Sequence, residues 1–594
     1  MSRNSVLFTA GAHRIIVGVD YGTTYSGLSF VTSNNTWEDI VIVSAWPGQR
    51  DKAWKTPTTI AYANENTKAS LTRNQWGFEV TRSLKQYVWT KLLLDKEVDT
   101  AQYDDPLLQQ MYGSGFLRLP PGKSAKDVAQ DYLSELYQYL MLRLEQELGS
   151  AALVQAMPME CWITMPAIWG NKAQRDTKEA ALGAGFGSRP GDKVNMITEP
   201  EAAALYALKP YLVPTALDPL KPGECVLICD CGGGTVDLVT YEILQTTPSL
   251  KLSEKCRGTG LKCGSTSIDR QFVQWMTKQF GQAYTNIDMK KRGPGSTFMK
   301  SFEGVKKNFG FKDVDKLHFE VGPLEMGCGM SPRYDDDEET VKIPRSDMVR
   351  FFEPAIKGLV AVIEGQLTQL KQLGKKLDRF ILVGGFGDSP YLNQELKQWC
   401  NLKGIKRFSC PTDCQAAIVK GAALRGLEGI RPQAIIARRN YGWSWGEAFR
   451  EGIDDEANAY THKFDGRKMC RGKMHWAVLK NQELDQSFSI TKDVSHSSET
   501  TGVNCSTLEL YSCSLDSPPE REEHFSVRRE SVIETMWDPN NDKVESCWSA
   551  RLRKTVYRFN YEMMVDFRSE DGLLDFKSMV DGVQVGKTRI KFDA

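Results

Sequence analysis

The chain has 594 residues, of which 41% are hydrophobic and 25% charged, a composition that excludes collagen-like, low-complexity and largely disordered proteins. Its length corresponds to about three to five structural units. Lys and Arg together number 75, as do Asp and Glu, so the formal net charge is zero, and we expect neither a nucleic-acid nor a membrane partner, which a basic surface would attract.

Strand and helix signals alternate from about residue 14 to residue 425. Short apolar segments that favour buried strands, each followed by Gly or Pro, lie at residues 14–20, 160–165, 225–230 and 379–383. The clearest helix begins after Ser124, which forms a capping box with Asp127, and ends at Gly149. A second helix is predicted from about Ser346 to Leu373. Together these elements predict a layered α/β architecture.

The last part of the chain has a different pattern. From about Arg431 helical periodicity weakens, and residues 442–446 and 495–501 are predicted to be loops. Alternating apolar and polar residues then predict antiparallel strands with one solvated face at residues 507–511, 525–528 and 557–563. We therefore place a domain boundary near residues 426–440.

Fourteen cysteines could indicate a secreted, disulfide-bonded protein, but other features oppose this. Residues 1–19 lack the apolar run of a secretory signal, and no segment reaches the ~18 apolar residues of a membrane span. The cysteine spacing matches no zinc site. We therefore expect free thiols and a reducing, intracellular location in the cytoplasm, with the nucleus left open.

A short internal repeat relates the ends of two predicted strands. Residues 17–24 and 227–235 each place an aspartate, Asp20 or Asp230, at the end of an apolar strand, followed by a Gly/Thr turn and a second strand. Such glycine turns aim backbone N–H groups at an anion, and an Asp beside phosphate is favourable when Mg²⁺ lies between them, directly or through its water shell. Two such turns from related halves predict a clamp on the β- and γ-phosphates of a nucleotide. The alternative is that both aspartates only cap tight turns.

A third turn follows the strand at residues 380–383. It contains Gly384, Gly385 and Gly387, and the backbone over the first two can approach a flat ligand closely. The alternative is an ordinary strand-to-helix connection. Neither a Walker A loop nor a dinucleotide-binding glycine motif is present at these turns.

These motifs resemble those of the actin-like ATPase superfamily and, within it, the seventy-kilodalton heat-shock chaperone family. The resemblance covers residues 14–427 and rests on the two phosphate turns (18–26 and 230–237), the adenosine turn (382–385), two linking helices (197–204 and 416–423) and residues 56–61 and 164–167. It implies a two-lobed, duplicated ribonuclease-H-like fold. Lobe I would span residues 1–198, lobe II residues 199–427, and a C-terminal β-rich region residues 428–594.

The resemblance also implies roles for individual residues. Asp20 and Asp230 would hold Mg²⁺ through water, and Glu199 and Asp237 would orient the attacking water or the metal shell. The family's phosphate lysine matches Lys91, with Lys85 as the alternative. ATP or ADP would be bound by Gly22, Thr23, Thr24, Tyr25, Gly232, Gly233, Gly234, Thr235, Glu303, Lys306, Lys307, Gly384, Gly385 and Phe386. From the residues alone, Glu199 equally fits a helix cap, and Glu303 with Lys306 a surface ion pair.

Two departures from the family pattern limit these expectations. The family has Ser-Thr-Arg after the adenosine glycines, whereas here Phe386-Gly387-Asp388 stands, and Asp388 cannot supply a cation. Beyond residue 427 we find no acidic leucine-rich linker, no clear peptide-binding sandwich and no helical lid, which resembles a divergent, lid-less branch.

We therefore predict a slowly hydrolysing, Mg²⁺-dependent ATPase that acts as a chaperone-like conformational switch and binds a protein or peptide client through its C-terminal region. The alternatives are a nucleotide-binding scaffold that does not hydrolyse ATP, a small-molecule kinase of the same superfamily, and an actin-like filament.

Overall fold

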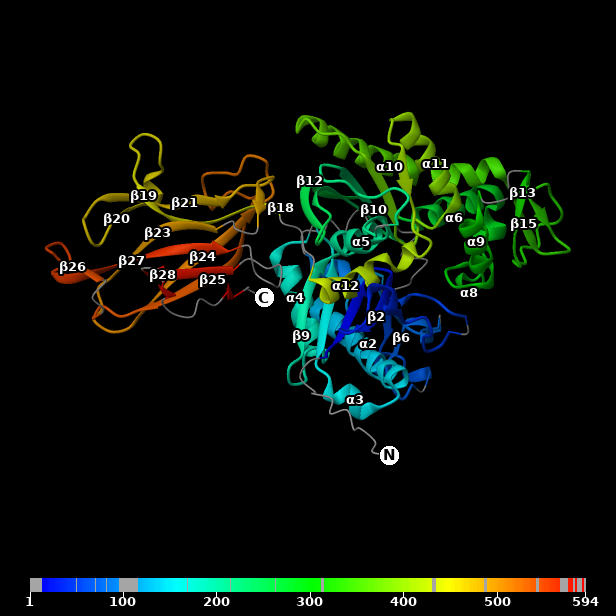
Figure 1. Ribbon diagram of the computed structural model, residues 1–594, viewed down its shortest axis with the longest axis horizontal. Helices are drawn as coiled ribbons and strands as arrows, with labels where there is room; N and C mark the ends of the chain where they lie inside the picture. The colour runs from blue at the N-terminus through cyan, green and yellow to red at the C-terminus, as the bar shows by residue number, and fades with distance from the viewer. Residues whose placement is uncertain are drawn as a thin grey trace. The chain divides into compact units, whose positions relative to one another are not determined.

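The four strands predicted before residue 384 are all present in the computed structural model, as β1 (Ile15–Tyr21), β8 (Met159–Met165), β10 (Cys225–Cys231) and β16 (Arg379–Val383) (Figure 1). The two long helices are α2 (Ala125–Leu148), with the predicted Ser124–Asp127 capping box, and α10 (Arg345–Gln372). The structure describes residues 13–49, 51–69, 71–81, 83–95, 116–167, 169–213, 215–261, 263–310, 315–429, 434–485, 489–540, 544–566, 575–580, 583–584 and 590–591. It divides into two compact units, Met1–Pro432 and Gln433–Ala594.

The first unit contains two sheets with the same local order. In one, β2 (Tyr25–Thr32) is antiparallel to β1, and β8 and β9 (Lys193–Thr198) follow in parallel. In the other, β11 (Val236–Gln245) is antiparallel to β10, and β16 and β17 (Arg407–Ser409) follow in parallel. The internal repeat of the sequence therefore corresponds to a sheet topology that occurs twice in this unit. The edges add β3 (Val41–Ile42) and β4 (Thr56–Pro57) to the first sheet and β12 (Lys251–Leu261) to the second.

Each sheet is covered on both faces, which explains why its central strands are continuously apolar. Alternate residues of β1 pack with α2 in one core, whereas Ile16 belongs to a second core with α5 (Glu199–Leu208) and α12 (Ala417–Glu428). That second core also contains Ile228 of β10. Figure 1 shows α5 and α12 in the middle of this unit, with β10 on one side and β2 on the other.

The outer face of the second sheet carries the remaining helices of lobe II. Its core is rich in aromatic side chains, and Phe272 stacks on Phe302 with ring centroids 3.8 Å apart. The elements are α6 (Thr266–Phe280), α7 (Gln282–Thr285), α8 (Met289–Arg292), α9 (Thr297–Asn308), α10, α11 (Pro390–Leu402), β13 (His318–Val321), β14 (Tyr334–Asp335) and β15 (Thr340–Pro344). In lobe I, β5 (Thr59–Ala61), β6 (Gln75–Trp76), β7 (Tyr87–Val88), α3 (Ala151–Ala156) and α4 (Asn171–Gly183) complete the described strands and α-helices.

The crossing of α5 and α12 leaves no room for a side chain. A Cβ atom at Gly421 would lie only 1.7 Å from the backbone oxygen of Ala202, so the glycine is required for the two helices to touch. The backbone oxygen of Val419, on the same helix, accepts a 2.7 Å hydrogen bond from Ser29 of β2. The crossing therefore fixes the position of lobe I relative to α5.

The second unit is built from antiparallel strands that form two sheets. One contains β19 (Asn440–Ala448), β20 (Ala459–Thr461), β21 (Lys468–Val478), β24 (Asn504–Cys513), β25 (Val527–Trp537) and β30 (Ile590–Lys591). The other contains β23 (Ser489–Ser498), β26 (Val544–Ser549), β27 (Lys554–Asp566), β28 (Asp575–Val580) and β29 (Val583–Gln584). A short pair joins β18 (Ala434–Ile436) to β22 (Glu483–Asp485). The described part of this unit contains no α-helix.

Three expectations for this region were wrong. Residues 442–446 form part of β19 rather than a loop: Gly442 allows close approach to β21, where a Cβ would lie 1.9 Å from the His475 oxygen, and Trp443 is fully buried. Most of residues 495–501 also lies in a strand, β23. The two sheets share one core, in which the rings of Trp537 and Phe559 stack at 5.3 Å, so a β-sandwich is present where no clear sandwich was expected.

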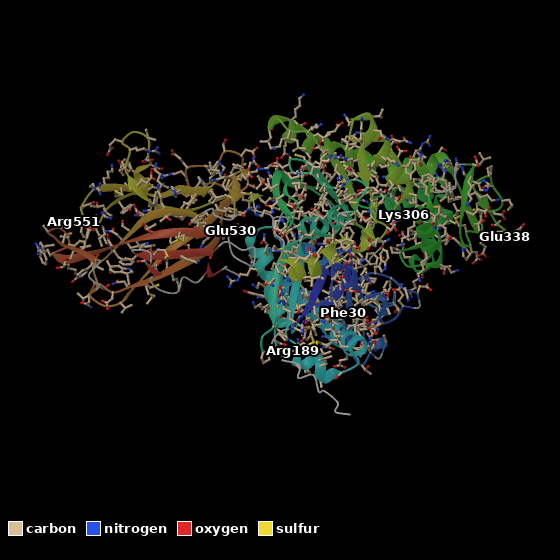
Figure 2. The ribbon with its side chains drawn as sticks, in the orientation of Figure 1. Phe30, Arg189, Lys306, Glu338, Glu530 and Arg551 are labelled. Carbon is tan, nitrogen blue, oxygen red and sulfur yellow. The ribbon has the colours of Figure 1, made fainter. Side chains whose placement is uncertain are left out.

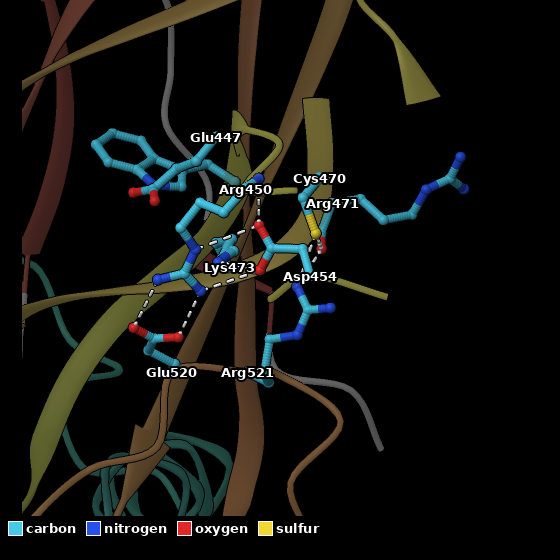
Figure 3. Close-up of polar contacts among 9 residues, drawn as sticks. Glu447, Arg450, Asp454, Cys470, Arg471, Lys473, Glu520 and Arg521 are labelled. Carbon is cyan, nitrogen blue, oxygen red and sulfur yellow. Dashed lines mark hydrogen bonds and ion pairs between the residues drawn. The ribbon is translucent and has the colours of Figure 1, made fainter. Parts of the chain in front are cut away.

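A cluster of ion pairs, with the side chains of Asp454 and Lys473 at its inaccessible centre, holds the loop after β19 (Figure 3). Asp454 accepts hydrogen bonds from Arg450 and pairs with Lys473 of β21 at 2.6 Å. Arg450 also pairs with Glu520 at 2.8 Å. The bonds from Arg450 and Lys473 hold the pKa of Asp454 well below its ordinary value, so the charged carboxylate stabilises the folded unit.

Two general findings concern the whole described chain. All fourteen cysteines are free, and most are buried, as expected for small apolar side chains. Among the described residues, no helix has both the length and the apolar character needed to cross a bilayer.

The helix crossing predicts opposite effects for two glycine substitutions. Gly421→Ala should destabilise the chain by about 1–3 kcal/mol, because the methyl group forces α5 and α12 apart. Gly365→Ala, on the open surface of α10, should stabilise it by about 0.5–1 kcal/mol, because alanine favours helix. Denaturant unfolding measures both, and equal effects of the two substitutions would contradict the proposed close packing.

The ion cluster predicts a pH-dependent effect on the second unit. Asp454→Asn should lower the melting temperature at pH 7, where the carboxylate is charged. The difference from wild type should shrink progressively as the pH falls below 3.8, the ordinary pKa, because the stability that a depressed pKa contributes is complete above that value and is lost as the pH falls toward the lower pKa of the folded chain. Asp493→Asn, on the exposed part of β23, is the control. An unchanged melting temperature at pH 7 would show that the cluster does not stabilise the unit.

Candidate functional site

The two predicted phosphate turns face each other across the lobes of the first unit. Each turn is tight: the Gly232 N–H donates to the Thr235 oxygen at 2.9 Å, and a Cβ at Gly22 would lie 2.1 Å from the Tyr25 oxygen. A Cβ at Gly233 would lie 2.8 Å from the Thr24 hydroxyl oxygen, so the loop of lobe II contacts the loop of lobe I. The sequence prediction that these turns converge agrees with this geometry.

Charged side chains from both lobes are buried behind these turns. Asp20 accepts a hydrogen bond from the Thr164 hydroxyl at 3.1 Å and pairs with Lys55 at 2.6 Å. Glu199, at the start of α5, pairs with Lys91 at 2.6 Å, and both side chains are nearly inaccessible to solvent. The ammonium of Lys91 also lies over the rings of Tyr21 and Trp169, at 5.6 and 5.2 Å from their centroids.

The remaining two carboxyl groups lie opposite each other on β10 and β11, where Asp230 pairs in register with Asp237. Burial raises the pKa of Asp230 well above its ordinary value, and the charges of Glu199, Asp237 and Asp20 raise it further, although Lys55 opposes them. Burial also raises the pKa of Asp237 to about 7, with Glu199 adding to the rise and Lys91 opposing it. The site thus contains more carboxyl groups than lysines, and it favours the protonated form of two of them.

These residues fit a hydrated divalent cation. Four carboxyl groups face two ammonium groups, and the Oδ1 atom of Asp230 is buried without a hydrogen-bond partner among the described residues. No group of three or more His, Cys, Asp or Glu side chains in the described part of the chain is placed to coordinate a metal directly. Carboxylate oxygens that are too few for a direct cage suit Mg²⁺, which keeps several of its waters.

The adenosine turn packs directly against the second phosphate turn. Gly384 has a φ of 90°, and a Cβ there would lie 2.2 Å from Asp230 Oδ1, so only glycine fits. Gly385, in contrast, has open space where its side chain would be. The ring of Phe386 is buried in the lobe II core, 6.2 Å from the Phe352 centroid, so its backbone rather than its ring borders the turn.

Glu303, Lys306 and Lys307, which the resemblance assigns to nucleotide binding, all lie on α9, where Figure 2 labels Lys306. Lys306 is buried and pairs with Glu303 at 2.5 Å and with Asp269 of α6 at 2.8 Å, whereas Lys307 is exposed. Tyr25 of lobe I, at the start of β2, is 49% exposed.

The structure separates the two candidate phosphate lysines. Lys91 lies within the carboxylate cluster, whereas Lys85 pairs at the surface with Glu65 at 2.7 Å. Sequence reasoning missed Lys55, which no motif assigned. The available signal was its position directly before residues 56–61, one of the segments that carry the family resemblance. Asp388, the departure from the family pattern, accepts a 2.8 Å hydrogen bond from Gln415.

The raised pKa of Asp237 predicts how stability depends on pH without nucleotide. Because the folded pKa is about 7 and the ordinary value 3.8, the folded chain binds more protons in this window, and stability falls as the pH rises through it. Asp237→Asn removes this penalty, so the variant should gain stability relative to wild type between pH 5 and pH 8. Thermal unfolding at both pH values measures the gain, and a difference independent of pH would contradict the assignment.

Comparisons with known proteins agree with this architecture. Residues 16–430 match the family model described as Hsp70 protein. The sequence is 23% identical to Heat shock 70 kDa protein 12B of Homo sapiens, over 84% of this chain and 81% of that protein. It is 25% identical to Heat shock 70 kDa protein 12A of Mus musculus, over 72% of this chain and 71% of that protein. It is also 25% identical to Chaperone protein DnaK of Thermotoga maritima, over 71% of this chain and 61% of that protein.

The family match confirms the resemblance inferred from the motifs and the two-lobed actin-like ATPase fold that it implied. Because the match covers well over half of the residues, the chain belongs to the Hsp70 protein family, as a divergent member of it.

Proposed function

We propose that the chain is a Mg²⁺-dependent ATPase that binds ATP between its two lobes and hydrolyses it slowly, by attack of water on the γ-phosphate. The observation that carries this proposal is the contact between the two phosphate turns, where Gly233 of lobe II meets Thr24 of lobe I, with four buried carboxyl groups behind them. Membership of the Hsp70 family supports nucleotide binding in general.

Different groups of the site contact the phosphates and the metal ion. The hydroxyl groups of Thr23, Thr24 and Thr235, with the N–H groups of both turns, bind phosphate oxygens. When bound, Mg²⁺ neutralises phosphate charge and is held through its waters by Asp20 and Asp230.

Two further carboxyl groups act on the attacking water. Asp237, with its pKa of about 7, orients the water and accepts its proton. Lys91 holds Glu199 in place through their 2.6 Å ion pair, and Glu199 in turn orients the water shell. On the other side of the cleft, Gly385 leaves open space where adenosine rests.

We further propose that nucleotide state controls a chaperone-like switch. ATP and ADP make different contacts with the two turns, and only such a difference can shift the equilibrium between lobe arrangements. The antiparallel unit at residues 433–594 is the part we assign to a protein or peptide client. One of the relatives is named a chaperone protein, which supports this assignment.

A second candidate is a nucleotide-binding scaffold without turnover. The observation that favours it is Asp388, a carboxylate bonded to Gln415 beside the adenosine turn, where the family carries a cation. This candidate and the ATPase differ in a single measurable step, the release of phosphate.

Single-turnover phosphate release from MgATP, with and without unfolded peptide, tests the ATPase directly. Asp20→Ala and Asp230→Ala should each slow release at least about a hundredfold, because each removes a group that positions charge in the transition state. The exposed Asp51→Ala is the control and should match wild type. An unchanged rate in the two cleft variants would refute the site, and a wild type that MgATP stabilises without phosphate release would select the scaffold.

A further inference from the structure

Lys55 lies beside Asp20 in the candidate site. Neither the motifs nor the family match assigned it a role. Its ammonium lies 2.6 Å from Asp20 Oδ2, and its side chain is only 18% exposed. Lys91, the lysine predicted from the family, is occupied by Glu199 and by two aromatic rings. Lys55 is thus the lysine in direct contact with the aspartate that we assign to the metal.

The backbone next to Lys55 is held by the first phosphate hairpin. Thr56 pairs in register with Ser26 of β2, and the Thr58 N–H donates to the Thr24 oxygen at 2.8 Å. A Cβ at Gly27 would lie 3.4 Å from Lys55 Cγ, so the lysine stem runs along this glycine. The ammonium is therefore positioned by the same hairpin that binds phosphate.

The ammonium of Lys55 is paired with a carboxylate oxygen, that of Asp20. A compact ammonium group with three donors also binds phosphate oxygens well. It also shares the ligand preference of a metal ion, namely carboxylate and phosphate oxygens.

We propose that Lys55 is a tethered cation that partly replaces the divalent metal in the nucleotide cleft. Without nucleotide it neutralises Asp20, and with nucleotide bound it turns to the phosphate oxygens that approach this aspartate. The inference rests on the proposed nucleotide site and adds two properties to it. The chain retains nucleotide when divalent metal is removed, and the metal must compete with Lys55 for Asp20.

Binding of ADP with Mg²⁺ and with EDTA tests the first property. Lys55→Met should weaken binding in EDTA about tenfold to a hundredfold, the effect of removing one charged contact, but much less in Mg²⁺. Lys55→Arg should restore most of the binding in EDTA, because it keeps the charge. Lys85→Met, which removes an equal charge at the surface pair with Glu65, should change neither value. Equal weakening of Lys55→Met in both conditions, or none in either, would overturn the proposal.

Binding of Mn²⁺ alone, followed by electron paramagnetic resonance, tests the second property. Lys55→Met should bind Mn²⁺ more tightly than wild type, because Asp20 and Asp230 lose their nearest cation. A folding defect would weaken Mn²⁺ binding, so tighter binding separates the proposed role from a structural one. Unchanged or weaker Mn²⁺ binding would overturn the inference and leave the ATPase proposal intact. A wild type that binds no ADP in Mg²⁺ would refute the nucleotide site itself.

Discussion

The two lobes depend on one constraint, the contact between α5 and α12 at a position where a methyl group does not fit. Gly421 lets the helices touch at Ala202. One helix begins with Glu199, and the other packs on the strand that carries Asp20. The crossing thus sets the distance between carboxyl groups contributed by different lobes. Both helices are rich in alanine, which suits such a close approach.

The crossing of α5 and α12 also brings carboxyl groups close enough to repel one another. Four carboxyl groups lie within one partly desolvated region, and two of them have raised pKa values, first because burial disfavours the charged form and then because the neighbouring carboxylates repel it. Without a ligand, the arrangement of these carboxyl groups is therefore less stable than when a compensating positive charge is present. A ligand that changes this balance would change the relative stability of closed and open arrangements, which is the physical basis of the switch that we propose.

Much of this organisation could be predicted, because its signals are local. Strands such as β10 are buried on both faces and read as continuous apolar runs, and Ser124 with Asp127 marks a helix start by its own hydrogen bonds. Contacts between distant residues gave no such signal. Lys55 and Asp20 meet only in the folded chain, Phe386 turns its ring into the core, and β23 pairs with β27 across more than fifty intervening residues. Gly442 was misread because a glycine that permits close strand packing looks like a loop residue.

The hydrogen bonds of the adenosine turn join it to the second phosphate turn. The backbone oxygen of Cys231, one residue beyond Asp230, accepts the N–H groups of both Phe386 and Gly387, at 2.8 and 3.3 Å. The two turns therefore belong to one hydrogen-bonded part of lobe II. If a nucleotide binds as we propose, its base side and one phosphate side would move together, and separation of the lobe I hairpin from Gly233 would be the movement that opens the site.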